Sequence, residues 1–205
     1  MVDMTVDMTV DGEKRFDHRG NARLFSAALV ASTGRVFHFP VRQPDLSYEE
    51  MQLIENLPFS IDTHMQASSP SVVRNILKEI LREATNVIVF NEEHERKLFP
   101  FLNEVDSRGR PLFKVQDAMK RAAPYVKQWN PYFSDYEYPS LGMTASHFGL
   151  KFIDPGWHDA HADAQMTLDI WHYMERNPPF SVKGHQVPFE KELSPPVLIE
   201  HDLPF

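Results

Sequence analysis

The sequence has no cysteine among its 205 residues, which excludes disulfide bonds and thiolate metal sites. It also lacks a long hydrophobic run, since the longest, residues 24–31, is too short to cross a bilayer. The N-terminus is rich in Asp and Thr and lacks the basic and then apolar order of a signal peptide. We therefore expect a cytoplasmic protein with no membrane partner, in which oxygen or imidazole groups hold any metal.

Acidic residues outnumber basic residues in the sequence. The chain has 21 Lys and Arg against 29 Asp and Glu, a net charge of -8. Proteins that bind nucleic acid along a broad face usually carry a basic surface, so this charge argues against that mode of binding. The objection is weaker for an enzyme that holds a few nucleotides beside an acidic metal site.

The chain divides into a core-forming part and a tail. With 42% hydrophobic residues, the length suffices for one domain with a core, predicted at residues 1–177. Residues 178–205 contain six prolines and few periodic apolar positions, so we expect an extended C-terminal tail.

Hydrophobic periodicity within the domain predicts alternating strands and helices. Apolar residues at alternate positions 2 to 10 indicate a strand that ends at 11–13, and residues 24–30 and 36–41 indicate a β-hairpin around the turn at 32–35. The further predicted elements are a short helix at 47–56, a helix at 71–81, a buried strand at 87–90, helices at 91–99 and 140–149, and a helix from 157–164 to Asn177. This order favours an α/β sheet flanked by helices.

Three groups of carboxylates fall at the ends of these elements: at positions 11 and 13, at 92, 93 and 95, and at 159 and 163. Element ends are a common location for sites, so the groups are candidates to converge. Several carboxylates with one histidine suit Mg²⁺ or Mn²⁺. Two such ions can clamp the oxygens of a phosphodiester while a histidine activates water. Taken singly, the first group is also typical of a solvated turn and the second of charge at a helix N-terminus.

An aromatic, proline-containing loop follows residue 127. It includes Trp129 and Tyr132, and lysines and an arginine precede it at 114, 120, 121 and 127. Aromatic faces beside cations can stack bases and neutralise phosphates, which predicts substrate contact here. Aromatic side chains that cover a core edge are the alternative.

These motifs, in this order, resemble those of the DEDDh 3′–5′ exonuclease superfamily, which includes proofreading exonucleases and RNase T. The segment 10–13, Val-Asp-Gly-Glu, resembles the first motif, Asp-x-Glu, and residues 23–30 follow it as the second strand. Residues 158–164, His-Asp-Ala-His-Ala-Asp-Ala, match the third motif, His-x-Ala-x-x-Asp-Ala. The second motif is usually a strand followed by His-Asn-x-x-Phe-Asp. Residues 90–95, Phe-Asn-Glu-Glu-His-Glu, keep only its Asn.

The resemblance implies a ribonuclease-H-like mixed sheet and assigns roles to residues. Asp11, Glu13 and Asp163 would be metal ligands, and His158 the base that activates water. Glu95 would stand where the family has Asp, and its extra methylene shifts the carboxylate by more than the about 0.5 Å that catalytic placement tolerates. His161 is the rival for the base role, although it does not match the motif. Gly12, Asn91, Trp129 and Tyr132 are the candidate substrate contacts.

The last residues of the tail, Asp202, Leu203, Pro204 and Phe205, resemble the C-terminal tip of bacterial single-stranded DNA-binding proteins. A terminal Phe with its carboxylate can enter an apolar pocket ringed by basic residues. The tail is therefore a candidate ligand for the proteins that normally receive that tip. An ordinary polar tail is the alternative.

We therefore predict an exonuclease that uses two Mg²⁺ or Mn²⁺ ions to shorten the 3′ ends of single-stranded DNA or RNA, with DNA slightly favoured by the tail. A homodimer is one expected assembly, because these families often work as dimers. The first alternative is a catalytically weakened exonuclease fold that docks replication or repair proteins through the tail. A metal-binding phosphatase would explain the carboxylates but not their order.

Overall fold

The computed structural model describes residues 5–16, 22–43, 46–47, 50–52, 58–127, 129–130, 132, 135–151 and 159–178. A five-stranded sheet with the order β3-β2-β1-β4-β5 forms its centre. The first three strands are an antiparallel meander, and the last two run parallel to β1. The strands are β1 (Asp7–Phe16), β2 (Ala22–Ala31), β3 (Val36–Pro40), β4 (Asn86–Val89) and β5 (Val115–Asp117). This mixed sheet confirms the predicted α/β class.

The predicted hairpin is present as β2 and β3. Its turn is closed by hydrogen bonds from the Gly34 N–H to the Ala31 carbonyl and from the Ala31 N–H to the Arg35 carbonyl, both 2.9 Å. Gly34 has a φ of 85°, a conformation that costs glycine little and other residues more. The turn residues therefore account for the position of the hairpin.

Strand β1 ends later than the sequence pattern predicts. Instead of ending at 11–13 it continues to Phe16 and pairs with β2 over nearly its whole length, with a register shift between Glu13 and Lys14. The apolar alternation stops at Asp11, but the backbone hydrogen bonds to β2 maintain the strand. Strand β4 pairs with residues 7–9 of β1, and no strand among the described residues lies on the β4 side of the later part of β1.

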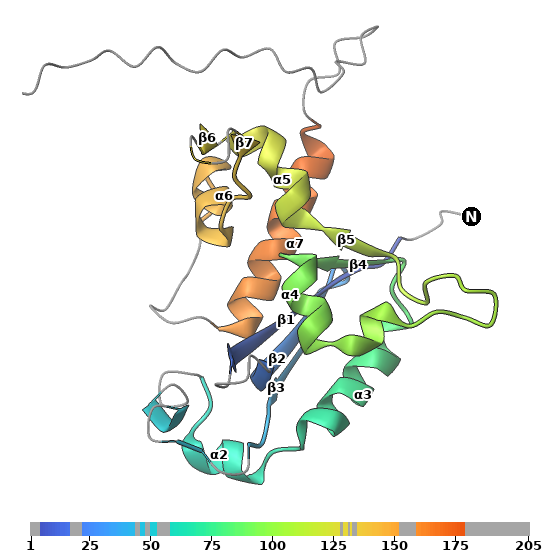
Figure 1. Ribbon diagram of the computed structural model, residues 1–205, viewed down its shortest axis with the longest axis vertical. Helices are drawn as coiled ribbons and strands as arrows, with labels where there is room; N and C mark the ends of the chain where they lie inside the picture. The colour runs from blue at the N-terminus through green and yellow to red at the C-terminus, as the bar shows by residue number, and fades with distance from the viewer. Residues whose placement is uncertain are drawn as a thin grey trace, which may run out of the picture.

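Helices cover both faces of the sheet (Figure 1). On one face, Met8 and Val10 of β1 pack with Leu77 and Leu98 in the largest core cluster. On the other face, Ile88 of β4 packs with α5, α6 and α7. The helices are α3 (Pro70–Leu81), α4 (Glu92–Leu98) and the short η1 (Pro100–Asn103) on the first face, and α5 (Ala118–Val126), α6 (Leu141–His147) and α7 (Ala160–Arg176) on the second.

Local signals explain where several helices begin and end. The Ser140 hydroxyl accepts a hydrogen bond from the Met143 N–H at 3.2 Å, and Gly149, with a φ of 67°, follows the end of α6. Ser47 and Glu50 bond reciprocally through side chain and backbone as a capping box, and residues 50–52 are helical. These positions confirm the predicted starts at 140 and 47, although residues 53–57 lie outside the described chain.

Several elements were not predicted. They are the three-residue strand β5, the helices α2 (Ile61–Gln66), η1 and α5, and a small hairpin of β6 (Trp129–Asn130) and β7 (Asp135–Tyr136). Apart from α5, each is too short to show a period in the sequence. In the described part of the chain, we find no helix with the length and apolar character needed to cross a membrane. The predicted tail at 178–205 lies outside the described residues, apart from Pro178.

Candidate active site

Three of the predicted carboxylates come together. Asp11 and Glu13 of β1 and Asp163 of α7 each present an oxygen, and these oxygens lie within 4.8 Å of one another. The side chain of Asp163 is buried, and those of Asp11 and Glu13 are half-buried. Such a set of close oxygens is able to share one divalent cation. The set is called the carboxylate triad below.

The triad forms because one face of β1 meets the first turns of α7. Asp11 and Glu13 are two residues apart, so they point to the same face of the strand. On that face the small residues Ala160 and Ala164 of α7 pack in one cluster with Ala28 of β2. Small side chains allow the helix to approach the sheet closely, and this brings Asp163 to the strand.

The start of α7 is fixed by the residue before it. The Asp159 carboxylate accepts a hydrogen bond from the His161 N–H at 3.0 Å, and its carbonyl accepts one from the Asp163 N–H at 2.9 Å. Asp159 is thus a helix cap, and Asp163 lies one turn later. His158, the predicted base, directly precedes this cap and lies outside the described residues.

Glu95 of α4 reaches the same region from the other side of β1. Its side chain is 2% exposed, and its Oε1 lies 3.4 Å from the Lys14 Nζ. Its Oε2 is buried and has no hydrogen-bond partner in the described structure. Because β4 stops before this point, α4 occupies the space beside the later part of β1. Glu95 lies near the triad but outside the group whose oxygens are within 4.8 Å.

The four carboxylates affect one another electrostatically. Burial, followed by the negative charges of Glu95, Asp163 and Glu13, raises the pKa of Asp11 well above its usual value, while Lys14 opposes this rise. Burial also raises the pKa of Glu95 to about 7, although the ion pair with Lys14 works in the opposite direction. Negative charge therefore exceeds positive charge in a partly desolvated place, which favours a bound cation.

The residues fit a hard divalent metal. The donor atoms are carboxylate oxygens, and no cysteine is present in the sequence. The buried Glu95 Oε2, which no described group satisfies, offers one more oxygen at the edge of the triad. Such a ligand set suits Mg²⁺ or Mn²⁺ better than a metal that prefers sulfur.

Two of the predicted substrate-contact residues, Gly12 and Asn91, have structural roles in the fold. Gly12 is buried on the opposite face of β1, where a Cβ atom would come within 2.6 Å of Leu24 Cδ1 and 3.0 Å of Phe99 Cζ. Asn91 has a φ of 75° and accepts a hydrogen bond from the His94 N–H as the N-cap of α4. Contact of either residue with substrate remains a prediction.

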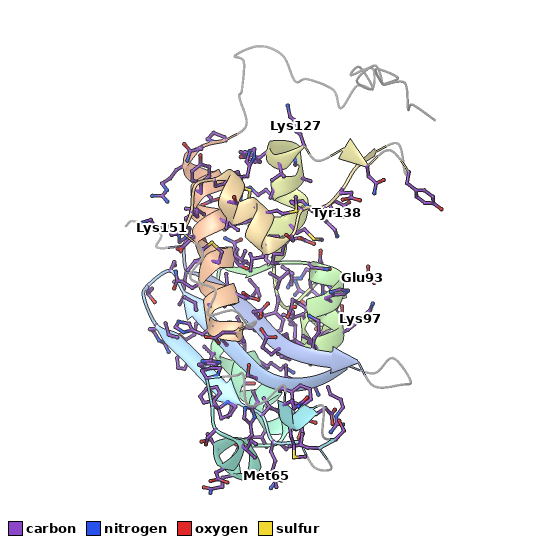
Figure 2. The ribbon with its side chains drawn as sticks, turned by 90° about the vertical axis from the view of Figure 1, so that its left-hand side faces the viewer. Met65, Glu93, Lys97, Lys127, Tyr138 and Lys151 are labelled. Carbon is purple, nitrogen blue, oxygen red and sulfur yellow. The ribbon has the colours of Figure 1, made fainter. Side chains whose placement is uncertain are left out.

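The aromatic loop contains the hairpin β6–β7. Tyr132, between its strands, is 86% exposed, and Tyr138, just after them, is 60% exposed. Figure 2 shows Tyr138 and Lys127 toward one end of the molecule and Met65 at the other. Trp129 is the first residue of β6 and pairs with Tyr136 through the backbone. Its predicted contact with substrate remains untested, as does that of Tyr132.

Sequence reasoning missed two features near the triad. The first is Lys14, although a cation directly after Glu13 was a visible signal. The second is His38 of β3, whose Nε2 is 3.4 Å from Asp159 Oδ1 without hydrogen-bond geometry and whose ring lies 5.8 Å from that of His161. Burial lowers the pKa of His38, against the opposing charge of Asp159. No local pattern indicated this contact, and it shows that His161, the rival for the base role, lies toward β3.

No family model matches the sequence, and no curated protein matches it. Solved structures of exonucleases do match the fold. The nuclease domain of 3′hExo, a DEDDh family member bound to rAMP, aligns with 86% of this chain and 94% of that one at 14% identity and a TM-score of 0.59. Exonuclease I of E. coli with a dA16 oligonucleotide aligns with 86% of this chain and 42% of that one, at 12% identity and a TM-score of 0.60.

A 3′-exonuclease that recognises the stem-loop of histone mRNA also matches, at 13% identity and a TM-score of 0.59. The match covers 84% of this chain and 64% of that one, so the chain spans less than two thirds of that neighbour's length. With its sheet order and flanking helices, the chain has the ribonuclease-H-like fold of the DEDDh 3′–5′ exonucleases.

Proposed function

We propose that this chain is a divalent-metal-dependent 3′–5′ exonuclease of the DEDDh type that acts on single-stranded nucleic acid. One observation carries the proposal. On an exonuclease fold, the first and third sequence motifs supply Asp11, Glu13 and Asp163, and their oxygens lie within 4.8 Å of one another. Chance acidic residues far apart in sequence would rarely meet in this way at the motif positions.

Asp11, Glu13 and Asp163 would hold the metal, and the free oxygen of Glu95 would add a ligand. The exonuclease resemblance implies two ions, Mg²⁺ or Mn²⁺. When bound, they would supply positive charge at the attacking and leaving oxygens of the phosphodiester.

The protein's own groups would orient and activate the nucleophile. In the proposal, His158 accepts the proton of the attacking water. The hydrogen bond from the His161 N–H to the Asp159 carboxylate fixes the start of α7. Asp159 is the residue that directly follows His158. Tyr132 and Trp129 of the aromatic hairpin would stack bases of the substrate strand.

The substrate class is proposed to be single-stranded ends, with DNA slightly favoured over RNA. The structural neighbours include exonuclease I with a dA16 oligonucleotide and 3′hExo with rAMP, so both sugar types occur among them. The preference for DNA rests on the tail tip Asp202 to Phe205 and its likeness to single-stranded DNA-binding proteins. Deleting the last four residues should weaken binding to partners that receive such a tip, and unchanged binding would refute this role.

A cleavage assay tests the main proposal. The full chain is incubated with 5′-labelled DNA and RNA oligonucleotides in Mg²⁺ or Mn²⁺, beside Asp11→Ala and His158→Ala variants. We expect a ladder of 3′-shortened products that disappears in both variants. Matched controls are Asp62→Ala, an exposed carboxylate on α2, and His147→Ala, an exposed histidine at the end of α6. Equal ladders in the active-site variants would point to a contaminating nuclease.

A second candidate is an exonuclease fold that has become an interaction module. The ion pair between Lys14 and Glu95 favours it, because Glu95 replaces the usual Asp of the second motif and is already engaged. This alternative predicts no product with any metal or substrate. A Glu95→Asp variant sharpens the distinction, since a gain in cleavage would show that Glu95 occupies the catalytic position with imperfect geometry.

A further inference from the structure

Lys14 pairs with Glu95 and also acts electrostatically on Asp11 of the triad. It directly follows Glu13, at the register shift where Glu13 pairs with Ser26 but Lys14 pairs with Leu24. Such an irregularity re-aims the side chains next to it. The Lys14 ammonium lies 3.4 Å from Glu95 Oε1, and its side chain is only 21% exposed. The cation is therefore partly shielded from solvent at this place.

The two oxygens of Glu95 have different surroundings. Oε1 accepts a hydrogen bond from Lys14, whereas the buried Oε2 has no hydrogen-bond partner among the described groups. A carboxylate this deeply buried needs positive charge nearby. In the metal-free protein Lys14 supplies that charge. A divalent cation that binds Glu95 would therefore meet an ammonium group already in contact with the same carboxylate.

We propose that Lys14 is a positioning residue that makes the site take up metal in two unequal steps. The first ion binds the triad of Asp11, Glu13 and Asp163. The second ion has to displace Lys14 from Glu95. This inference rests on the proposed metal-dependent function and adds to it that Lys14 restrains the second position.

The ion pair between Lys14 and Glu95 also gives a role to the Glu95 side chain, which is one methylene longer than the Asp of the second motif. The ion pair with Lys14 holds the carboxylate beside the triad and outside its 4.8 Å group, so the triad is complete without it. Occupancy of the second position then depends on the strength of one ion pair. At low metal concentration the protein would hold one ion, and at higher concentration two.

Metal titration tests this inference with the full chain. Binding of Mn²⁺ is followed by electron paramagnetic resonance of the free ion and by isothermal titration calorimetry, in the wild type and in Lys14→Met. We expect two unequal steps in the wild type. In Lys14→Met, affinity for the second ion should rise about tenfold and affinity for the first ion should change much less, because the competing charge next to Glu95 is gone.

Two variants serve as controls. Lys14→Arg keeps the charge and should retain the unequal steps. Lys97→Met removes a lysine from the same helix as Glu95, where it pairs at 2.7 Å with the exposed Glu93 (Figure 2), and it should bind metal as the wild type does. Circular dichroism confirms folding of each variant, and Lys14→Gln gives the same readout if Lys14→Met is unstable.

A double variant separates positioning from a general charge effect. In a Glu95→Gln background, Lys14→Met should no longer change the second step. An equal gain for both ions, or unchanged affinities in Lys14→Met, would overturn the inference and leave the exonuclease proposal intact. Two unequal, Lys14-dependent steps without cleavage of any oligonucleotide would refute the exonuclease and support the inference. Absence of any metal binding would overturn both.

Discussion

Asp7 and Asp11 lie four residues apart on the same face of β1, yet their surroundings differ. The Asp7 carboxylate accepts a 2.7 Å hydrogen bond from the Asn86 side chain and lies 3.8 Å from His172 of α7. The Asp11 carboxylate accepts no hydrogen bond within the described part of the chain, and three other carboxylates surround it. Both residues face α7, but among the described groups only the Asp7 carboxylate has a hydrogen-bond donor.

The difference separates a structural carboxylate from a functional candidate. A buried charge that is hydrogen-bonded and lies near a histidine contributes to the fold. A partly buried charge among like charges costs stability unless a ligand compensates it, and such groups cluster at functional sites. The same strand therefore carries one acid that is hydrogen-bonded within the fold and one that we propose as a cation ligand.

The largest expected difference between Asp7 and Asp11 lies in the effect of their substitution on catalytic activity. Asp11→Ala should lower the rate of 3′ cleavage by about a thousandfold, because it removes a proposed metal ligand that would support charge stabilisation. Asp7→Ala should leave the rate nearly unchanged, since Asp7 does not belong to the triad. Single-turnover kinetics with a labelled oligonucleotide measure both. A comparable loss in Asp7→Ala would show that the structural carboxylate also serves catalysis.

The next prediction concerns pH. Because the pKa of Glu95 is raised to about 7 in the fold, the folded state binds a proton between pH 4.5 and 7 that the unfolded state releases. The free energy of unfolding of the metal-free protein should therefore fall across this window, by on the order of 3 kcal/mol. The raised pKa of Asp11 acts in the same direction.

Urea denaturation at pH 5, 6, 7 and 8 measures this dependence. Buried histidines act in the opposite direction, because burial lowers the pKa of His64, for example, from 6.5. A Glu95→Gln variant isolates the carboxylate, and its stability should fall much less between pH 5 and 7. If the free energy of unfolding falls equally with pH in the wild type and in Glu95→Gln, then Glu95 is not the origin of the pH dependence.

Substitution of Asp7 and substitution of Asp11 should change the free energy of unfolding in opposite directions. Asp7→Ala leaves the Asn86 amide without its partner and should lower the free energy of unfolding by about 1 to 3 kcal/mol. Asp11→Asn removes a charge from the acidic group and should raise the metal-free stability by about 1 kcal/mol. Thermal and urea unfolding in the presence of a chelator report both. Destabilisation in Asp11→Asn would mean that the acid also supports the fold.

The resemblance to the exonuclease motifs predicted the members of the triad, and local periods account for much of its geometry. Alternation along β1 places Asp11 and Glu13 on one face, and the third motif places Asp163 one turn into a capped helix. The alanines at 160 and 164 then bring the helix to the strand. Each step uses a regular element, and regular elements are what hydrophobic patterns predict.

The Lys14–Glu95 pair and the His38–His161 contact could not be derived in this way. The first depends on a register shift inside β1 and on α4 passing the end of a four-residue strand. The second joins a sheet edge to a helix start more than 100 residues later in the chain. Both follow from tertiary packing, for which a single sequence carries no periodic signal. The same holds for β5, whose three residues are recognised only by their pairing with β4.

The smallest expected effect extends the comparison to aromatic residues. Phe148 stacks on Tyr173 at 4.4 Å and serves the core, whereas Tyr132 exposes 86% of its surface. Tyr132→Ala should change the free energy of unfolding by less than about 0.5 kcal/mol. It should raise KM for single-stranded oligonucleotides about fivefold, the lower limit for loss of one stacked base. Tyr138→Ala is the matched control, and an equal rise in both would indicate a general aromatic surface. If KM is unchanged in Tyr132→Ala, the exposed ring has no part in holding the strand, and the phosphodiester would have to be positioned by the groups around the triad alone.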